Sequence, residues 1–323
     1  MRIVLAGSVD SSERTLAALL RHGAQVVAVL GFEPVDRAAV SGFVDLGPLA
    51  YAHGIPFFTF RRINDCAAQI ASFSPDALFI VGLSQLIDGA LLNLPTRGSI
   101  GFHPTRLPAG RGRAPLAWMI ESRQDGAATF FKLTEGIDDG DILVQVPFRL
   151  DEHDDAARLA DKVLSALDEA LDNWLPRLLA GDVDGHPQDS RRATYFGRRT
   201  PEDGLIDWHE SAASIARLVR AAARPHPGAF SYLRDDRLIV WRAEPEQELR
   251  ITGVVGRIVQ VDTHGLVVQT GDGLLRVLDW HTDARTEPRV GERFGYRPDI
   301  ELNELRSRVS LLEQQVARLV AGK

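Results

Sequence analysis

The chain has 323 residues, 45% of them hydrophobic and 25% charged, and its formal net charge is −7. This composition is ordinary for a globular protein, and the length allows two domains and a small third element. No apolar run approaches the roughly 18 residues that a membrane span needs, and the acidic balance argues against a protein that mainly grips nucleic acid. The single cysteine, Cys66, excludes an internal disulfide and a cysteine-based metal cluster.

The N-terminal half alternates strand-like runs with helical patterns. Arg2 to Ala6, Gln25 to Leu30 and Ala77 to Val81 are apolar runs typical of buried strands, and an amphipathic pattern lies between the first two. This alternation predicts an α/β fold with a doubly wound, mostly parallel sheet. Because the chain opens directly on a strand, we expect no signal peptide and a cytoplasmic protein.

The turn from Gly7 to Ser12 joins the first strand to the first helix. It lacks the Gly-x-Gly-x-x-Gly pattern of a dinucleotide site. A helix N-terminus can bind an anion, but a plain turn is the favoured interpretation.

A histidine and an aspartate-rich turn follow strand-like runs. His103 comes at the end of the run that starts at Ser99, and a loop dense in proline, glycine and arginine follows as far as Pro115. The cluster Glu135–Asp141 lies between two further strand-like runs, Ala128–Leu133 and Ile142–Phe148. An imidazole and a carboxylate at two strand ends predict an acid/base site in an open α/β sheet.

The alternative is a packed histidine beside an ordinary turn. Spacing does not choose among the three aspartates of the turn, Asp138, Asp139 and Asp141. No histidine or carboxylate spacing predicts a metal site, and no Gly-x-Ser-x-Gly elbow supports a hydrolase.

The second half begins with a long helix and continues into strands. Asp155 to Leu179 is amphipathic and predicts a packing helix that Pro176 bends or closes. Beyond a helix at Ala212–Ala222, four strand-like runs predict a small OB-like β-barrel: Leu238–Arg242, Thr252–Val261, Leu266–Thr270 and Leu274–Trp280. The strand-like runs contain no lysine and few aromatic residues, which favours a scaffold or lid over nucleic-acid binding.

The C-terminal segment carries a heptad repeat. Its a and d positions are Leu302, Leu305, Val309, Leu312, Val316 and Leu319. Valine at two a positions and leucine at every d position favour a parallel two-stranded coiled coil, so we expect a homodimer through residues 301–323. A helix folded back onto its own barrel is the alternative.

The motifs around the histidine resemble those of a known family. The runs His103-Pro-Thr-Arg-Leu-Pro-Ala-Gly-Arg-Gly-Arg-Ala-Pro115 and Gly136-Ile-Asp138-Asp-Gly140 are similar to the signature of the folate-dependent formyltransferases. That family includes methionyl-tRNA formyltransferase, glycinamide ribonucleotide formyltransferase and the sugar-nucleotide N-formyltransferases. The segment Tyr195–Trp208 resembles the one that follows the catalytic domain in the longer members, and the sugar-nucleotide enzymes are closest in pattern.

The resemblance implies a formyltransferase-type, Rossmann-like catalytic domain that uses 10-formyltetrahydrofolate as co-substrate and no metal. It implies that His103 and Asp138 are catalytic. It also implies a folate pocket lined by Leu83, Ser84, Gln85, Leu86 and Ile87. Thr105, Arg111 and Arg113 are the candidate substrate-binding residues, because guanidinium groups suit phosphate oxygens.

One family residue is missing. The family triad is Asn, His and Asp, and this chain has Gly101 where the asparagine is expected. Loss of one oxyanion donor typically costs about 3–4 kcal/mol in the transition state. Four nearby residues could supply a replacement donor: Ser84, Gln85, Ser99 and Thr105.

The amine that accepts the formyl group is predicted from the short loop between Gly31 and Asp45. Between Gly31 and Asp45 only Arg37 is basic, whereas methionyl-tRNA formyltransferases carry a longer basic insertion at the comparable place. A nucleotide-linked amino-sugar is therefore the favoured acceptor. The alternatives are another amine (an amino acid, a hydroxylamine precursor or methionyl-tRNA) and a non-catalytic folate-binding homologue, the latter because of Gly101.

These patterns together predict four parts. They are a catalytic domain at 1–188, a connecting segment and helix at 189–225, an OB-like barrel at 226–298 and a coiled-coil dimerisation helix at 299–323.

Overall fold

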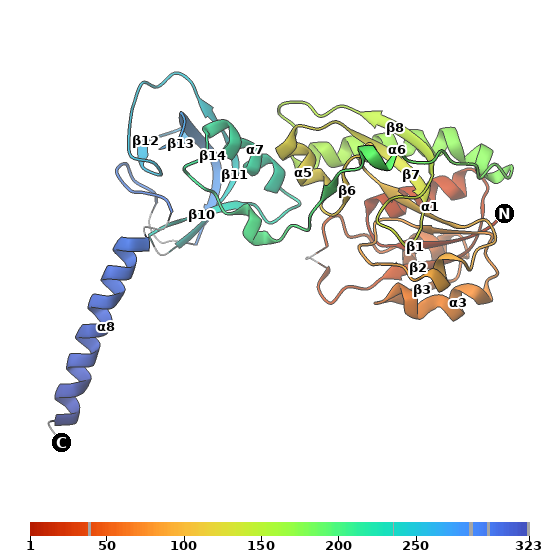
Figure 1. Cartoon of the computed structure of the whole chain (residues 1–323), viewed down its shortest axis with the longest axis horizontal. Coiled ribbons are helices and arrows are strands. Elements are labelled where there is room, and N and C mark those ends of the chain that lie inside the picture. The colour runs from red at the N-terminus through yellow and green to blue at the C-terminus, as the bar shows by residue number, and fades with distance from the viewer. Residues whose placement is uncertain (38–39, 235, 284–286, 296–297, 322–323) are drawn as a thin grey trace. The chain divides into compact units, whose positions relative to one another are not determined.

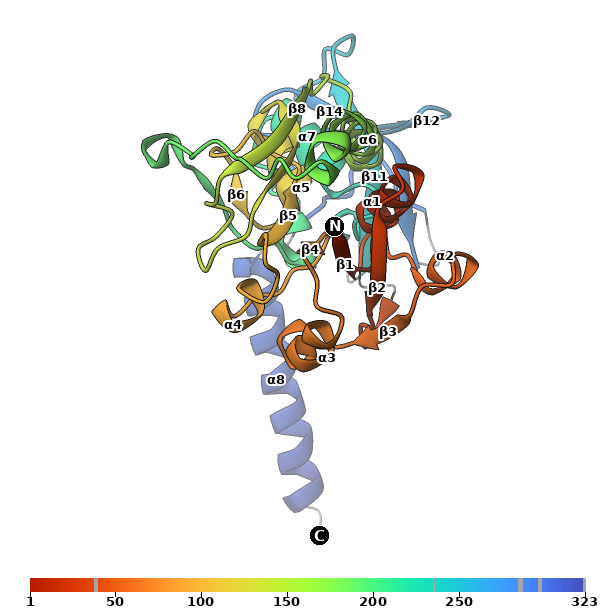
Figure 2. The ribbon, with the colours of Figure 1, turned by 90° about the vertical axis from the view of Figure 1, so that its right-hand side faces the viewer.

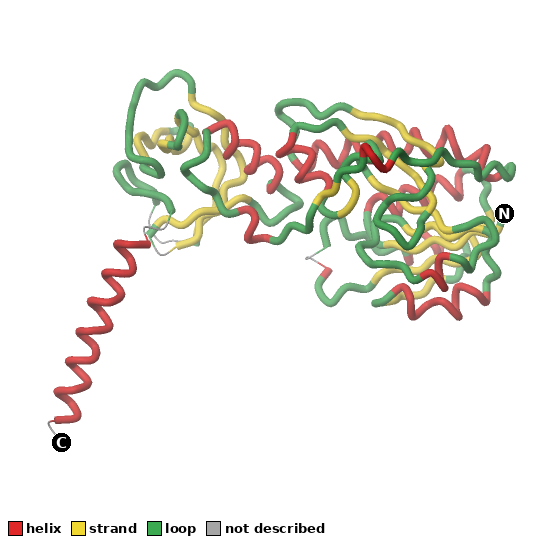
Figure 3. Tube along the Cα trace, viewed as in Figure 1, coloured by secondary structure: helices red, strands yellow, loops and turns green. Residues whose placement is uncertain are grey.

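The computed structural model describes residues 1–37, 40–234, 236–283, 287–295 and 298–321 (Figure 1). The chain divides into two compact units. Unit 1 comprises Met1–Asp203 and Arg220–Pro227, and unit 2 comprises Gly204–Val219 and Gly228–Lys323. Figure 3 shows helices and strands interspersed in the first unit, whereas strands dominate the second until the final helix.

Unit 1 is built on a seven-stranded sheet in the order β3-β2-β1-β4-β5-β7-β8. Its strands are β1 (Arg2–Gly7), β2 (Gln25–Phe32), β3 (Phe57–Phe60), β4 (Ala77–Ile80), β5 (Ser99–His103), β7 (Gly126–Lys132) and β8 (Ile142–Phe148). The first five are parallel, and β7 and β8 are antiparallel to their neighbours. This confirms the predicted mostly parallel sheet, although the sequence patterns did not predict β3. A separate ribbon pairs β6 (Arg111–Gly112) with β9 (Tyr195–Phe196).

Helices cover both faces of this sheet (Figure 2). They are α1 (Asp10–Arg21), α2 (Gly47–Ala52), α3 (Ala67–Ser72), α4 (Gly89–Leu92), α5 (Pro115–Ser122) and α6 (Ala156–Leu179), with short 3₁₀ turns η2 (Ile63–Cys66), η3 (Ser190–Arg192) and η4 (Pro201–Gly204). One core packs α1 and α6 against the sheet, and a second packs η2, α3 and α4 against the opposite face. Cys66 is buried in the second core.

Local sequence explains the longest helix of unit 1. The Asp155 side chain accepts a hydrogen bond from the Arg158 backbone N–H, which caps the start of α6. Apolar residues at helical spacing are buried along one stripe: Leu159, Val163, Leu167, Leu171, Trp174, Leu175 and Leu178. The helix ends at Leu179, three residues after Pro176, where Gly181 with φ = +102° allows the N–H groups of Gly181 and Asp182 to cap the carbonyl oxygens of Leu178 and Arg177.

Unit 2 contains a five-stranded antiparallel sheet in the order β10-β11-β14-β13-β12. The strands are β10 (Ala229–Leu233), β11 (Asp236–Glu246), β12 (Ile258–Asp262), β13 (Gly265–Gln269) and β14 (Leu274–Thr282). Bridges from Phe294 to Leu233 and from Arg293 to Arg257 connect the two sides of the sheet, as in a barrel. The predicted strand at Thr252–Val261 is too long: β12 begins only at Ile258, after a turn at Gly256 whose φ is +81°.

Two further helices complete the chain. Helix α7 (Ala212–Ala222) contributes residues to both units, and α8 (Pro298–Ala321) is the final long helix. The predicted fold class is therefore confirmed: a mixed, mostly parallel sheet with helices, an antiparallel β-unit and a terminal helix. In the described part of the chain, no helix is long and apolar enough to cross a membrane.

Candidate active site

His103 lies at the carboxyl end of β5 and is 6% exposed. Side chains alternate along a strand, so Ile100 and Phe102 pack into the core under α1 and α6 while Gly101 and His103 face the other way. The His103 Nε2 atom is 2.8 Å from the Gly110 carbonyl oxygen. A carbonyl oxygen can only accept, so Nε2 carries the proton and Nδ1 is the nitrogen that can take one.

Asp138 brings a carboxylate to the free nitrogen of this imidazole. Its Oδ2 atom lies 3.7 Å from His103 Nδ1 and accepts a hydrogen bond of 2.8 Å from the Gly112 backbone N–H. Gly112 has φ = +107°, a conformation open to glycine, and a Cβ there would lie 2.4 Å from the Phe196 carbonyl oxygen. Only glycine therefore lets this N–H reach the carboxylate.

The route of Asp138 to the site differs from the expected one. Strand β7 is antiparallel to β5 and ends at Lys132, which pairs with Ile100 rather than with His103. The last residues of β5 and β7 therefore lie apart. The loop 133–141 connects the end of β7 back to the site and places Asp138 beside His103. Asp138 itself has φ = +51°, a left-handed conformation that aspartate tolerates.

Gln188 holds this loop, a role that the sequence patterns did not predict. Its Nε2 atom donates to the carbonyl oxygens of Asp138 (2.8 Å) and Gly140 (2.7 Å), while its Oε1 atom accepts from Arg111 Nη2 (2.7 Å). Arg111 is 3% exposed, and its Nη1 atom also donates to the Tyr195 hydroxyl (3.1 Å). The Arg111 guanidinium thus braces the loop through Gln188, and whether it also binds substrate stays a prediction.

The other two predicted substrate residues differ in exposure. Arg113 is exposed, and its guanidinium makes no hydrogen bond within the described part of the chain. Thr105 is 3% exposed, and its hydroxyl is buried without a hydrogen-bond partner among the described residues. A buried unpaired hydroxyl is costly, so a native structure usually keeps one for a reason.

The space beside Gly101 is filled by apolar side chains. A Cβ at this position would lie 2.6 Å from Leu133 Cδ2 and 3.1 Å from Phe131 Cζ. Leu133 follows β7 and packs into the core under η2 and α3. The place where the family carries an amide is therefore occupied by hydrocarbon, and an asparagine there would force Leu133 to move.

Among the predicted replacement donors, two are already engaged. Gln85 donates to the Arg61 carbonyl oxygen (2.8 Å) and accepts from the Ile63 N–H (2.9 Å). Ser99 donates to the Leu92 carbonyl oxygen (3.1 Å). Ser84 is exposed, which leaves the Thr105 hydroxyl as the buried candidate without a partner.

The predicted folate segment follows β4 at the same edge of the sheet as His103. Leu83 and Ile87 are half-buried and pack on the core that includes Leu91, whereas Leu86 is 78% exposed. Asn64 fixes the segment by donating to the Leu86 carbonyl oxygen (3.1 Å) and accepting from the Asp88 N–H (3.1 Å). Because hydrogen bonds hold this loop in place, its exposed leucine offers an apolar surface on which a flat ring system can pack.

The geometry of His103 and Asp138 supports proton transfer at a site that is largely buried. One imidazole nitrogen is occupied by a carbonyl oxygen, and the other faces a carboxylate that is held by a backbone N–H. Such a pair can take up a proton and stabilise the resulting charge. In the described residues, no group of three or more histidine, cysteine, aspartate or glutamate side chains could hold a metal ion.

Comparisons with known proteins cover both units. The family described as "Formyl transferase" matches residues 58–175, and the family described as "Formyl transferase, C-terminal domain" matches residues 198–289. HypX from Aquifex aeolicus, solved in complex with tetrahydrofolic acid, is 18% identical with a TM-score of 0.62. That match covers 92% of this chain and 46% of HypX, so the chain spans about half the length of HypX.

Two other solved structures are matched over almost their whole length. An N-formyltransferase from Helicobacter canadensis, in complex with folinic acid and dTDP-3-aminofucose, is 15% identical with a TM-score of 0.64, covering 85% of this chain and 98% of that one. Methionyl-tRNA formyltransferase from Clostridium thermocellum is 20% identical with a TM-score of 0.55, covering 76% and 94%. At such identities the likeness concerns the fold.

Proposed function

We propose that this chain, which belongs to the formyl transferase family, transfers a formyl group from 10-formyltetrahydrofolate to the primary amine of a nucleotide-linked amino-sugar. The observation that carries the proposal is the pair formed by His103 and Asp138, 3.7 Å apart at the edge of the sheet. The bound folate supplies the formyl group, and the chain's own residues must bind it, orient the amine and move protons.

His103 acts through its Nδ1 edge. Its Nε2–H is committed to the Gly110 carbonyl oxygen, which fixes the ring orientation and the tautomer. When the amine attacks the formyl carbon, its nitrogen loses a proton and the departing nitrogen gains one. Nδ1 can accept the first proton and return it to the second nitrogen, so one imidazole serves both transfers.

Asp138 stabilises the charged state of that imidazole. Its Oδ2 atom faces Nδ1 at 3.7 Å, which is longer than a direct hydrogen bond but close enough for the negative charge of the carboxylate to stabilise a proton on Nδ1. The Gly112 N–H fixes the carboxylate from the other side, which removes the need to reorganise it during the reaction. Asp138 therefore stabilises the protonated form of His103 and is close enough to take part in moving a proton.

The developing negative charge on the formyl oxygen needs a donor. Because hydrocarbon fills the place of the family amide beside Gly101, we assign this role to Thr105. Its hydroxyl is two residues beyond His103, buried, and without a hydrogen-bond partner in the described chain. A donor held ready in a buried place acts more strongly than one in water.

The residues after β4 fit the folate. Leu83 and Ile87 offer half-buried apolar surface, and Leu86 offers an exposed side chain. The segment is braced by Asn64, so these groups are held in place before the ligand arrives. Burial of the exposed leucine against a flat ring contributes to binding.

Charge distribution favours a nucleotide-linked amino-sugar over tRNA. The net charge is −7, and the one basic residue between Gly31 and Asp45, Arg37, pairs with Glu33 at 2.9 Å. Arg113 is exposed next to Gly112, where a guanidinium can meet a phosphate. The Helicobacter canadensis N-formyltransferase was solved in complex with dTDP-3-aminofucose, which is a nucleotide-linked amino-sugar.

One observation favours a second candidate function. Leu133 fills the place of the missing amide at Gly101, as in a site that has stopped catalysing and only binds folate. A non-catalytic folate-binding homologue would keep the apolar segment at 83–87 and tolerate loss of the oxyanion donor.

Turnover separates these candidates. The purified chain is incubated with 10-formyltetrahydrofolate and one amine at a time, and release of tetrahydrofolate is followed against a reaction without amine. The amines are a set of nucleotide-linked amino-sugars, free amino acids, hydroxylamine and methionyl-tRNA. We expect release above the blank only with amino-sugar nucleotides. Folate binding without release on any amine contradicts the proposal and supports the binding protein.

A further inference from the structure

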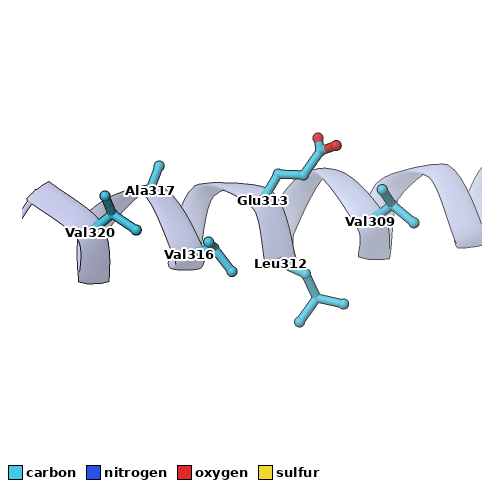
Figure 4. Close-up of a pocket in the computed structure, with 6 residues that line it drawn as sticks. All are labelled: Val309, Leu312, Glu313, Val316, Ala317 and Val320. Carbon is cyan, nitrogen blue, oxygen red and sulfur yellow. The ribbon is translucent and has the colours of Figure 1, made fainter.

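Helix α8 exposes a row of large apolar side chains. Every residue from 302 to 320 is exposed, including Leu305 (54%), Leu312 (58%) and Leu319 (75%). In Figure 4, Leu312 lies on one side of the helix and Glu313 and Ala317 point to the other. A helix that shows this much hydrocarbon to water gains stability when the row is covered.

The row has the spacing of a coiled-coil seam. From a at 302 to d at 319, six consecutive a and d positions are leucine or valine, over a length of about 27 Å. A straight seam of this kind is self-complementary, because an identical helix presents the same knobs and holes. The first candidate occupant is therefore a second copy of the chain.

Charges beside the seam specify how two copies align. In a parallel pair in register, each g residue faces the e residue five positions later on the partner helix. Arg308 occupies a g position and Glu313 the following e position, so the two attract across the interface. Glu301 and Arg306 have the same spacing and opposite signs. Symmetry makes each attraction occur twice.

An antiparallel pair uses these charges less well. There, e residues face e residues and g residues face g residues. With a and d layers matched over the same length, Arg308 faces the neutral Gln315, and only Arg306 with Glu313 makes an attractive pair. The parallel arrangement therefore has twice the number of attractive pairs, and no like charges face one another in it.

We propose that α8 of two copies of this chain forms a parallel, in-register, two-stranded coiled coil. The seam runs through Leu302, Leu305, Val309, Leu312, Val316 and Leu319, and the Arg308–Glu313 contacts set the direction. The proposal does not depend on the catalytic activity, so either can fail without the other.

Paired leucines that differ only in heptad position provide the first test. Leu311 and Leu312 are 56% and 58% exposed, but Leu311 is at c, outside the seam, and Leu312 is at d. The full chain is examined by sedimentation equilibrium over a range of concentrations. We expect a mass near twice 35.5 kDa for the unmodified chain and for Leu311→Lys, and a mass near 35.5 kDa for Leu312→Lys.

Charge reversal provides the second test and reports the direction. Arg308→Glu alone and Glu313→Arg alone each put like charges face to face twice, and we expect the dimer dissociation constant to rise about tenfold. The double variant Arg308→Glu/Glu313→Arg restores attraction in a parallel pair and should return to the original value. Arg318→Glu, at a c position, is the matched control and should leave the constant unchanged.

Each other outcome overturns part of the proposal. A dimer that survives Leu312→Lys has its interface elsewhere. A monomeric unmodified chain at all concentrations excludes self-association and leaves a different partner helix or a contact with the chain's own β-unit to cover the row. Failure of the double variant to recover, with both single variants weakened, contradicts the parallel alignment.

Discussion

Each unit contains a cluster of polar side chains, and the two clusters differ in how closely their charged groups are paired. In unit 1, His103 and Asp138 stand 3.7 Å apart, and the nearby Arg111 guanidinium is hydrogen-bonded to neutral groups of Gln188 and Tyr195. In unit 2, Arg276 contacts Glu246 at 2.7 Å and Asp262 at 3.0 Å.

The difference lies in what each cluster can do with a proton. Hydrogen bonds lower the pKa of the Asp262 carboxyl to about 2, and the bond from Gln260 has the largest effect, followed by the bond from Arg276. The backbone N–H of Glu248 and the Arg276 guanidinium likewise lower the pKa of Glu246. Such carboxylates stay charged at neutral pH and serve structure. The His103–Asp138 pair is held by backbone groups, and no hydrogen bond within the described chain occupies His103 Nδ1, so this nitrogen can exchange a proton.

Removal of the imidazole gives the largest expected effect. His103→Ala should lower turnover by about 10²–10⁴-fold, because the proton acceptor is lost while the binding residues remain. Turnover is measured by tetrahydrofolate release, and folate affinity is measured separately by fluorescence. His153→Ala, an exposed histidine of the same unit, is the control and should keep full activity. Unchanged turnover in His103→Ala would contradict the mechanism in which His103 transfers the proton.

The unpaired hydroxyl gives the next largest effect. Thr105→Val keeps the shape of the side chain and removes the donor, so we expect kcat to fall about 10²-fold. Because the hydroxyl has no partner in the described chain, the free energy of unfolding should not decrease. Thr105→Ser retains the donor and should retain most of kcat. A Thr105→Val variant with normal kcat assigns the oxyanion donor to another group.

Gln188 tests whether positioning of the aspartate loop matters. In Gln188→Glu, one oxygen still accepts from Arg111, but the donors to the carbonyl oxygens of Asp138 and Gly140 are lost. We expect kcat to fall about tenfold with little change in the folate KM, since a small misplacement of Asp138 slows only the reaction.

The new carboxylate also pairs with Arg111, which offsets only part of the stability lost when the two carbonyl oxygens lose their donor, so the melting temperature should fall by a few degrees. Gln124→Glu, at an exposed position of the same unit, is the control for the added charge. A kcat that stays normal well below the melting temperature would show that Gln188 has a purely structural role.

Local patterns predicted the layers of the fold but not the contacts that complete the site. The buried stripe of α6 has a clear helical period, and β1 and β4 are short, mostly apolar runs, so these elements predicted the α/β sheet. Strand β3 has four residues, too few for a period to be read. The resemblance selected Asp138, whereas the reversal of β7 that determines its approach has no local signature.

Long-range contacts explain the rest of what was missed. Gln188 reaches Asp138 across 50 residues from a turn-rich stretch whose composition only predicts a loop. Gly101 is visible as a departure from the family pattern, but its neighbour Leu133 becomes evident only when β5 and β7 are paired. Hydrophobic periodicity indicates which face of a helix or strand is buried. It does not indicate which residues from distant parts of the chain come into contact, and these side chains meet through such contacts.

The ion cluster of unit 2 should affect stability and leave catalysis alone. Arg276→Met nearly keeps the volume of the side chain and removes the positive partner of Glu246, whose side chain is 9% exposed and which then keeps only backbone donors such as the Glu248 N–H. We expect unfolding of unit 2 to be easier by about 1–3 kcal/mol, the usual cost of removing one partner of a buried charged group. Turnover below the melting temperature should be unchanged. Arg242→Met, at an exposed position on β11, is the control and should have a much smaller effect.

Acid provides the smallest and most specific test of the same cluster. The pKa of Asp262 is lowered from 3.8 to about 2 in the folded chain, so its contribution to stability is complete above about pH 5 and is mostly lost by the time the pH has fallen to about 2. Part of that lowering comes from Arg276, and Arg276→Met removes this part. The gap in melting temperature between the unmodified chain and Arg276→Met should therefore be constant from pH 7 to pH 5 and narrow between pH 4 and pH 2. Calorimetry over this range measures it, and two curves that stay parallel down to pH 2 would mean that Arg276 acts through packing and not through charge.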